Sequence, residues 1–372
     1  MAKKKPKTSS PQPEGTEVAP VAVDEAPDIN AMPTKGFFID MLTKDIGLVD
    51  AIIDLVDNSI DGARRHGGPD KKYHGKWVNV VTTKDEFRIE DNCGGIGVEN
   101  AKKKAFRLGR DKEVLPTKGS IGQFGVGMKR AIFKIGELIE VESRTKEDQF
   151  KLTIRVPEWS DTDVWGFNFD EAPSYKRLSA DATGTTIRVT ELDDGVAEEF
   201  QDNAFLTKLR DELQSKQYMS VNRGLEIKVN GQKLKQMKVE LLLSQLIVPM
   251  KEKFDIGDGE DKVSVEIIAG LRDDGQKNPT NAGWYVYCNG RAILEADQSP
   301  VTGWGEGNVP YYHSQFSKFR GYAFLEAENS SKLPWNTTKT GVEMSSEIYQ
   351  RVRRAMVKAS KPVLKFTYDL DR

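Results

Sequence analysis

Residues 49–63 read VDAIIDLVDNSIDGA, and this stretch has the spacing of an amphipathic helix. At about 100° per residue, its apolar side chains gather on one face and its polar ones on the other, namely Asp50, Asp54, Asp57, Asn58 and Asp61. Carboxylates on neighbouring turns repel one another unless a cation lies among them. An amide oxygen beside carboxylates suits Mg²⁺ that also holds a phosphate. We therefore interpret the polar face as a phosphate site, with a solvated surface face as the alternative.

Three further stretches have the composition of ligand-binding turns. Residues 89–97, IEDNCGGIG, place Asp91 at the end of a predicted strand, where its carboxylate could accept a hydrogen bond from a ligand amino group. Residues 119–127, GSIGQFGVG, precede a predicted helix, whose N-terminal amides could hold phosphates. This stretch is neither a Walker loop nor a dinucleotide fingerprint. Gly184-Thr185 opens a predicted strand. Each stretch alone could equally be an ordinary turn or strand start.

Together and in this order, the four stretches resemble the Bergerat nucleotide-binding fold of the gyrase, heat-shock-chaperone, histidine-kinase and MutL (GHKL) superfamily, over about residues 36–195. The resemblance implies an ATPase domain that binds ATP and Mg²⁺. It assigns the metal to Asn58, the adenine amino group to Asp91 and a further nucleotide contact to Asp61. It assigns the remaining ATP contacts to a larger set, Gly95, Gly97, Gly122, Gln123, Phe124, Gly125, Val126, Gly127 and Thr185. The segment from Glu99 to Ser120 is then the lid over ATP.

Two positions depart from the pattern of this superfamily. Hydrolysing members carry Glu where this chain has Asp54, the candidate general base that activates water. The missing methylene draws the carboxylate back by roughly 1 Å, and such a displacement can cost about a hundredfold in rate, so we expect slow hydrolysis. The second motif, Asp-Asn-Cys-Gly-Gly-Ile, has one residue more than the usual Asp-x-Gly-x-Gly. It leaves open which glycine faces adenine.

Two stretches farther along resemble the transducer domain of MORC and MutL ATPases, WYVYCNGR at 284–291 and LPWNTTK at 333–339. In those proteins a loop lysine reaches the γ-phosphate, and the resemblance gives this catalytic role to Lys339, together with Asp54. ADP cannot fully supply such a charge-assisted contact, so nucleotide state is expected to set the angle between the domains. A surface lysine in a threonine-rich loop is the alternative.

The order of helix and strand signals predicts an α/β fold, in which an α+β two-layer sandwich is followed by a transducer-like β-α-β domain. A length of 372 residues suits two domains. We expect a disordered tail over 1–33, a GHKL ATPase domain over 34–195 and a transducer-like domain over 196–372. Strands of the second domain are expected at 225–229, 263–269, 284–288 and 321–326, and its last helix over 345–360.

Composition excludes several classes of protein. The 55 Lys and Arg nearly balance 57 Asp and Glu, so the whole-chain charge of −2 carries no signal for nucleic acid. Two cysteines and three histidines are too few for a disulfide framework or a Cys/His metal cluster. No stretch approaches the roughly 18 apolar residues of a membrane span. We expect a cytoplasmic protein without a membrane partner.

The leading hypothesis is an ATP-gated clamp or switch that forms a homodimer through its ATPase domain when ATP orders the lid. Bacterial relatives of this architecture often belong to DNA-modification or phage-defence systems, so the resemblance implies DNA as a partner, and the short chain suggests a further protein subunit. The candidate DNA contacts are Lys102, Lys103, Lys104, Arg351, Arg353 and Arg354, for which solvated faces are the alternative.

Two other functions stay open, a nucleotide-binding regulatory subunit that does not hydrolyse ATP and a chaperone-like ATPase that acts on protein partners. Chain length disfavours a full heat-shock chaperone or gyrase subunit. A histidine kinase is disfavoured because the first histidine, His66, follows the candidate metal helix.

Overall fold

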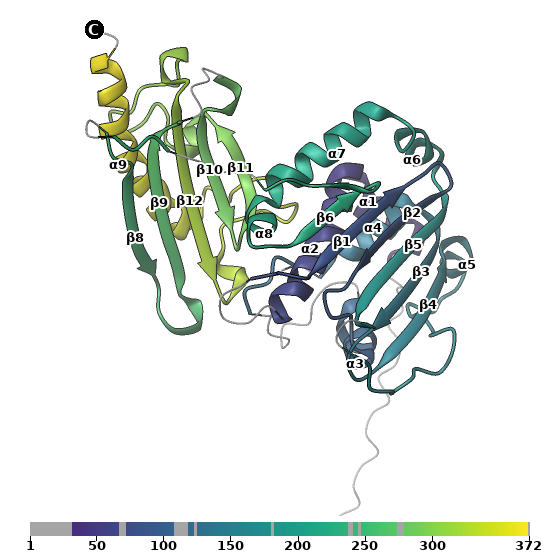
Figure 1. The fold of residues 1–372 in the computed structure, drawn as a ribbon. Coiled ribbons are helices and arrows are strands. Elements are labelled where there is room, and N and C mark those ends of the chain that lie inside the picture. The colour runs from purple at the N-terminus through teal and green to yellow at the C-terminus, as the bar shows by residue number, and fades with distance from the viewer. Residues whose placement is uncertain are drawn as a thin grey trace, which may run out of the picture.

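The computed structural model describes residues 32–66, 72–107, 118–122, 125–179, 182–236, 241–244, 247–273 and 279–370. Two β-sheets, each with helices packed against it, build the molecule (Figure 1). The α/β fold expected from the sequence is therefore confirmed. The tail expected over 1–33 falls almost wholly outside the described residues. Within the described ranges, no helix combines the length and the apolar character needed to cross a bilayer.

The first sheet has the strand order β4-β3-β5-β2-β1-β6-β7. Its neighbouring strands are antiparallel, except for the parallel pair β1 and β6. The strand bounds are β1 Trp77–Thr82, β2 Glu86–Asp91, β3 Gly136–Arg144, β4 Gln149–Arg155, β5 Gly184–Leu192, β6 Glu226–Val229 and β7 Gln232–Lys233. This sheet carries the second and fourth of the ligand-binding stretches, at the ends of β2 and at the start of β5.

The two faces of the first sheet differ in character, as the period-2 geometry of a strand requires. In β1, Val78 and Val80 are buried towards the helices. On the opposite face, Arg188 of β5 donates to Glu86 of β2 at 2.8 Å and to Glu140 of β3 at 3.1 Å, at exposed positions. One layer of helices on one face and a charged, solvent-facing layer on the other make a two-layer sandwich.

The helices of this layer include α1 (Lys35–Lys44), α2 (Leu48–His66), α4 (Gly127–Ile135) and α5 (Val156–Ser160). They lie behind the sheet in the view of Figure 1. Helix α2 packs against α4, and its apolar face is fully buried through Ile52, Ile53 and Val56. The stretch that opened the sequence argument is therefore the central helix of the domain.

The first residues of the expected lid form a short helical segment of an unusual kind. Helix α3 (Val98–Asn100) continues directly into a π-helix over Ala101–Ala105. The Lys129 ammonium of α4 donates to the Ala105 carbonyl at 3.0 Å. This carbonyl is therefore bonded to a side chain, as a backbone amide would bond to it if the helix continued. Of the lid expected over 99–120, residues 108–117 lie outside the described residues.

The boundary expected at residue 195 does not coincide with the end of the first sheet. After α6 (Asp194–Glu199), α7 (Asn203–Lys216) and α8 (Tyr218–Asn222), the chain returns to this sheet as β6 and β7. Strand β6 pairs with β1 and buries Ile227 and Val229 completely. Burying these two side chains stabilises the pairing of β6 with β1. Residues up to Lys233 therefore belong to the first sheet.

The second sheet has the strand order β11-β10-β12-β9-β8. Its strands are β8 Met250–Ile256, β9 Val263–Leu271, β10 Gly283–Cys288, β11 Arg291–Asp297 and β12 Phe319–Ala327. Helix α9 (Glu347–Leu370) packs across β8, β9 and β12 and continues ten residues beyond the expected end at 360. Strands β8 and β11 have no counterpart among the expected strands. Strand β11 follows β10 through Asn289 and Gly290, both at positive φ as in a type I′ hairpin turn.

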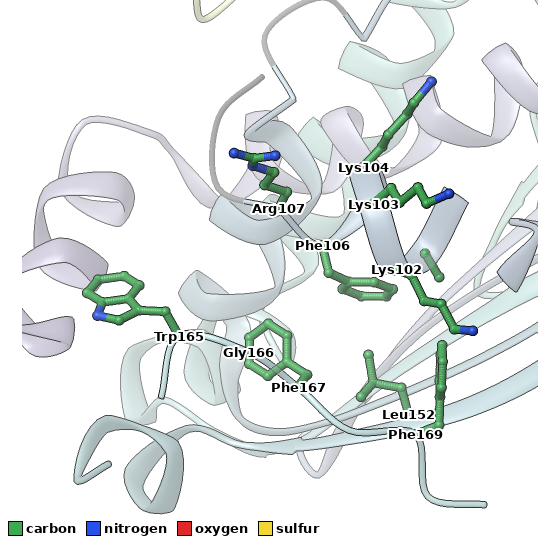
Figure 2. Close-up of a pocket in the computed structure, with 11 residues that line it drawn as sticks. Lys102, Lys103, Lys104, Phe106, Arg107, Leu152, Trp165, Gly166, Phe167 and Phe169 are labelled. Carbon is green, nitrogen blue, oxygen red and sulfur yellow. The ribbon is translucent and has the colours of Figure 1, made fainter. Parts of the chain in front are cut away.

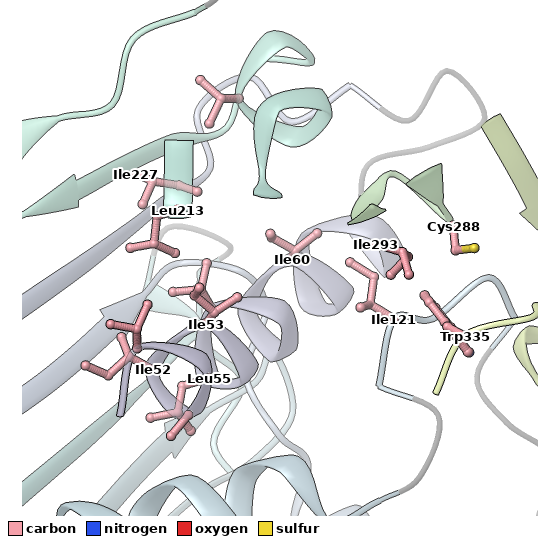
Figure 3. Close-up of a cluster of buried hydrophobic side chains, with 14 of the residues drawn as sticks. Ile52, Ile53, Leu55, Ile60, Ile121, Leu213, Ile227, Cys288, Ile293 and Trp335 are labelled. Carbon is pink, nitrogen blue, oxygen red and sulfur yellow. The ribbon is translucent and has the colours of Figure 1, made fainter. Parts of the chain in front are cut away.

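The two domains share one continuous apolar core. Figure 3 shows Ile60 of α2 and Ile121 next to Ile293, Cys288 and Trp335 of the second domain. All five are buried, the most exposed being Ile293 at 5%. The polar face of α2 therefore points into an interface between the two domains.

Candidate functional site

The acidic face of α2 is buried, so the alternative of a solvated face is wrong. Asp54, Asp57 and Asp61 are 4%, 0% and 7% exposed, whereas Asn58 is exposed. Repulsion between the carboxylates is relieved by basic side chains and amides from other elements rather than by a cluster of metal ligands. Among the described residues, no group of three or more His, Cys, Asp or Glu side chains is arranged to hold a metal ion.

Asp54 is held by two cations from opposite sides. Arg130 Nη2 of α4 lies 2.5 Å from Asp54 Oδ2, and Lys339 Nζ of the second domain lies 2.9 Å from Asp54 Oδ1. Gly127 leaves room beside this carboxylate, because a Cβ added there would lie 3.1 Å from Asp54 Oδ2. The candidate base thus lies against the N-terminus of α4, where the third stretch ends.

Asp57 continues this network on the next turn of α2. Its Oδ2 lies 2.9 Å from Lys339 Nζ, Gln217 Nε2 donates to its Oδ1 at 2.6 Å, and Arg291 Nε lies 3.4 Å away. Burial works to raise the pKa of Asp57, but attraction by Lys339 and Arg291 outweighs it and holds that pKa below 3.8. Burial likewise works to lower the pKa of Lys339, but Asp57 and Asp54 outweigh it and raise that pKa above 10.5. Lys339 is therefore a buried, charged link between the domains.

The charges of this network are close to balanced. Three cations, Arg130, Arg291 and Lys339, meet the carboxylates of Asp54 and Asp57, and the Glu295 carboxylate attracts Arg291 as well. Burying a charge is costly unless a counter-charge is supplied. An anion that binds here therefore has to take one of these cations from its carboxylate.

Asp61 takes two backbone amides of the third stretch. The amides of Ile121 and Gly122 donate to Asp61 at 2.7 and 2.8 Å. Burial raises the pKa of Asp61, and the nearby Arg64 and the two amides oppose that rise. The expectation that the Gly122 amide holds phosphate differs from this arrangement, because a carboxylate of the chain already accepts from it. The exposed Asn58 lies next to this turn, its Oδ1 3.5 Å from a Cβ built at Gly122.

Asp91 lies at the end of β2, in a pocket with a volume of about 50 Å³. The Ser59 hydroxyl donates to its Oδ2 at 2.7 Å and the Cys93 amide to its Oδ1 at 2.7 Å. Burial raises the pKa of Asp91 above 3.8, although these donors and the Thr185 backbone act to lower it. Asn58, Gly95 and Thr185 line the same pocket, so four predicted residues meet here.

The glycines of the second motif separate into different surroundings. Gly95 lines the Asp91 pocket at φ +74°, where an added Cβ would lie 2.2 Å from the Arg144 carbonyl oxygen. Gly97 instead precedes α3, where the Val98 amide donates to Asp148 at 3.0 Å. The candidate for the glycine that faces a ligand is therefore Gly95.

Other predicted residues divide as follows. Thr185 Oγ1 lies 3.2 Å from Ser143 Oγ, which also accepts from the Ile96 amide at 2.6 Å. Gly125, at φ +68°, and Val126 lead into α4. Gln123 and Phe124 lie outside the described residues.

The end of the expected lid is bonded to the second domain. The Gly119 amide donates to the Glu328 carbonyl at 2.7 Å, and the Ser330 hydroxyl donates to the Ser120 carbonyl at 2.5 Å. Arg64, at the end of α2, donates to the carbonyls of Gly119 and Asn289. Helix α2, the lid and the second domain therefore share one junction.

Sequence reasoning missed four members of the site: Ser59, Arg130, Gln217 and Arg291. Ser59 and Arg130 adjoin predicted motifs, and a basic residue within the apolar pattern of α4 was an available signal. Gln217 and Arg291 lie 160 and 234 residues from Asp57 along the chain, and no local pattern relates them to it.

Comparison with known proteins supports the reading of the first domain. Residues 46–185 match a family model described as histidine kinase-, DNA gyrase B-, and HSP90-like ATPase. The match covers α2, Asp91, the glycine-rich stretch and Thr185, and it supports a GHKL-type ATPase domain that binds ATP. Among curated proteins, no significant match to the chain is found.

Proposed function

We propose that this chain is a slowly hydrolysing ATPase that dimerises when it binds ATP and acts as a molecular clamp or switch. The observation that carries the proposal is the position of Lys339. Its ammonium lies 2.9 Å from both Asp54 and Asp57 and brings the second domain onto the helix of the matched ATPase domain. A lysine in this place can report on a terminal phosphate and transmit its presence to the second domain.

In this proposal, adenine binds against Asp91, with Thr185 and Gly95 beside it. A pocket of about 50 Å³ has room for only a few water molecules, so its walls open on binding. Phosphates lie towards Asn58 and the N-terminus of α4, within reach of the Arg130 and Lys339 side chains. Asn58, exposed and next to Gly122, would hold Mg²⁺, which neutralises phosphate charge when bound.

The γ-phosphate competes with Asp54 and Asp57 for Lys339. Once Lys339 moves to the phosphate, Asp54 loses one of its two cations, and its Oδ1 becomes free to accept a proton from water. ADP has no γ-phosphate and leaves Lys339 on its carboxylates. The same exchange alters the junction between domains, which is the proposed switch for the lid and for dimerisation.

The direct test is solution mass by light scattering with Mg²⁺, comparing no nucleotide, ADP and a non-hydrolysable ATP analogue. We expect a dimer with the analogue alone, and we expect Asn58→Ala and Lys339→Ala to lose it. Lys365→Ala, on the exposed side of α9, is the matched control and should dimerise normally. A mass that does not change while the analogue binds would rule out the clamp.

A nucleotide-binding regulatory subunit that does not hydrolyse ATP is the second candidate. The double pairing of Asp54 with Arg130 and Lys339 favours it, because each oxygen of the carboxylate already has a cation as partner and neither is open to a water molecule. Phosphate release that Asn58→Ala abolishes would contradict this candidate.

DNA is the partner we propose for the clamp, within a complex that includes a further protein subunit. The resemblance to MORC and MutL ATPases supports this choice. The whole-chain charge of −2 gives it no support. ATP-dependent, salt-sensitive DNA binding is expected. ATP-dependent binding of unfolded protein clients in its place would favour a chaperone-like ATPase.

A further inference from the structure

A second pocket, of about 630 Å³, lies at the edge of the first sheet and shares no lining residue with the Asp91 pocket. Three segments build it: the π-helix with the two residues after it, Leu152 of β4, and residues 165–169 (Figure 2). Its lining includes Lys102, Lys103 and Lys104, which are three of the DNA contacts expected from the sequence and belong to the expected lid. We call it the lysine–aromatic pocket, after the two kinds of side chain that line it.

Its wall is aromatic. Phe106, Trp165, Phe167 and Phe169 line the pocket, and each is only half-buried. A second row of rings fixes them from behind. Phe150 lies 5.1 Å from Phe169, and Trp159 lies 5.2 Å from Phe167 and 5.8 Å from Trp165, between ring centroids. The wall therefore offers partly exposed ring surface on a rigid support, at little entropic cost to a ligand that stacks on it.

Its rim is basic. Lys102, Lys103, Lys104 and Arg107 are exposed and line the pocket. Figure 2 shows the Lys102 side chain extending in the direction of Phe169. Glu99 lies 3.5 Å from Lys102 and 2.9 Å from Lys103, but these are surface pairs, which contribute little and which a phosphate can replace.

Other charges near the pocket leave the rim positive. Lys104 has no ion pair with any described residue, so its charge is available to a ligand. On the aromatic side, the Asp170 carboxylate already accepts from the Thr153 amide at 2.8 Å and from the Thr153 hydroxyl at 2.7 Å. The three lysines of the rim therefore lie near two carboxylates, Glu99 and Asp170, both of which have partners.

We propose that the lysine–aromatic pocket binds single-stranded nucleic acid, with bases against the rings and phosphates on the lysines. Aromatic faces beside a row of cations are the combination by which proteins hold single strands without sequence preference. An acidic peptide would satisfy the cations, but its side chains suit aliphatic walls equally well, whereas four rings favour flat bases. A duplex keeps its bases stacked inside the double helix, where the rings of the pocket cannot stack on them. This proposal takes its ligand class from the DNA partner proposed above, and it requires neither ATP binding nor dimerisation.

The test measures fluorescence anisotropy of a labelled oligothymidylate of about 15 nucleotides, within the range of one single-strand site, titrated with the full chain. The triple variant Lys102→Ala, Lys103→Ala, Lys104→Ala should bind at least about tenfold more weakly. Its slope of log affinity against log salt should be shallower by about 2, since each phosphate contact to a single strand contributes about 0.7. The matched control, Lys358→Ala, Lys361→Ala, Lys365→Ala, removes three exposed charges from α9 and should bind as the wild type does.

A second variant separates stacking from charge. Phe169→Leu keeps an apolar side chain but removes a ring, and it should weaken binding by about tenfold without changing the salt slope. Tyr311→Leu, which removes a ring that is 74% exposed in the second domain, is its control. Near-ultraviolet circular dichroism of each variant reports whether the aromatic cluster stays packed.

Each outcome decides the proposal. Binding that the α9 triple variant loses and the Lys102–Lys104 variant keeps would overturn this site and leave DNA as the partner. Tighter binding of a duplex, or displacement of the strand by oligoglutamate at equal charge concentration, would overturn the ligand class. Light scattering with the ATP analogue on the same samples shows separately whether the clamp works, so failure of the clamp is not confused with failure of this site.

Discussion

At the scale of single residues, the site depends on the side-chain length and position of one carboxylate, that of Asp54. Asp54 lies between Arg130 and Lys339 and is 4% exposed, so its charge is important for stability as well as for any reaction. Removing one partner of a buried ion pair costs about 3–5 kcal/mol, because the other charges stay buried without it. A substitution at this position therefore has to be measured for both folding and activity.

Asp54→Glu should increase ATP hydrolysis, by up to about a hundredfold, because the added methylene moves the carboxylate forward by roughly 1 Å while keeping its charge. Asp54→Asn should abolish hydrolysis and lower the free energy of unfolding by about 3 kcal/mol. Phosphate release and urea denaturation measure the two effects. A longer carboxylate that leaves the rate unchanged would show that Asp54 is not the base.

Asp91 should make ATP binding sensitive to acid. Its carboxylate must be ionised to accept from the adenine amino group, and burial raises its pKa above 3.8. Affinity for ATP is therefore full above this raised pKa and is lost as the pH falls through it, at a higher pH than for an ordinary aspartate. Titrations with a fluorescent ATP analogue at decreasing pH measure the midpoint.

The matched variant for this titration is Asp91→Asn, which should bind ATP weakly and without the acid transition. The contribution of this residue to the free energy of unfolding has the opposite dependence on pH. Because the pKa is raised, protonated Asp91 is the form that the folded state favours, so its contribution to stability is present below 3.8 and is lost as the pH rises through the folded pKa. Weaker ATP binding at low pH therefore cannot be attributed to unfolding through Asp91.

At the scale of elements, close contacts between strands decide which positions tolerate a side chain. Gly184 opens β5 at φ +158°, and a Cβ there would lie 1.8 Å from the carbonyl oxygen of Asp91. Both the start of β5 and the end of β2 would have to move. These are the two strand ends that line the Asp91 pocket.

Gly184→Ala should destabilise the fold by about 1–3 kcal/mol and weaken ATP binding, because it displaces Asp91 and Thr185 together. Gly195→Ala is the control, since that glycine lies in α6 with no atom within 4 Å of an added Cβ. The control should be neutral or slightly stabilising. Thermal unfolding and ATP titration compare the two, and equal stability of both variants would contradict the contact.

Elements with a strong local pattern could be predicted from the sequence, and others could not. Helix α2 has a clear amphipathic period, and β1 alternates buried and half-buried residues, so both could be predicted closely. Strand β8 is largely exposed and reads MKEKFDI. Charged residues interrupt the alternation of apolar and polar residues by which a strand is predicted. Strand β11 depends on the hairpin turn at Asn289 and Gly290, whose signal was present but not used.

The same distinction holds for the site. Asp91 and Asn58 belong to short motifs, and they lie in one pocket as expected from those motifs. Arg291 and Gln217 reach Asp57 only through the packing of the second domain onto α2. Asp61 was expected to contact the nucleotide, but it accepts from two amides of the chain, which depends on the conformation of the turn at 121–122.

At the scale of the whole molecule, Arg64 connects three parts that the proposed switch must move together. It leaves the end of α2 and donates to Gly119, at the end of the lid, and to Asn289, in the turn of the second sheet. It does not line the Asp91 pocket, and no phosphate contact is assigned to it. Its effect on a switch should therefore be separable from its effect on nucleotide affinity.

Arg64→Ala should bind the ATP analogue within about threefold of the wild-type affinity, yet lose most of the dimerisation that the analogue drives. The physical reason is that the buried Asn289 and the half-buried Gly119 lose the charged donor of their carbonyls, a loss of about 1–3 kcal/mol at the junction, which is enough to shift a two-state equilibrium by about tenfold or more. Light scattering and ATP titration on one preparation measure both quantities. Arg155→Ala removes an arginine whose ion pairs among the described residues are with the exposed Glu158 and Glu191, and it should change neither. If Arg64→Ala dimerises normally, the lid and the second domain do not communicate through this junction, and Lys339 alone must carry the signal.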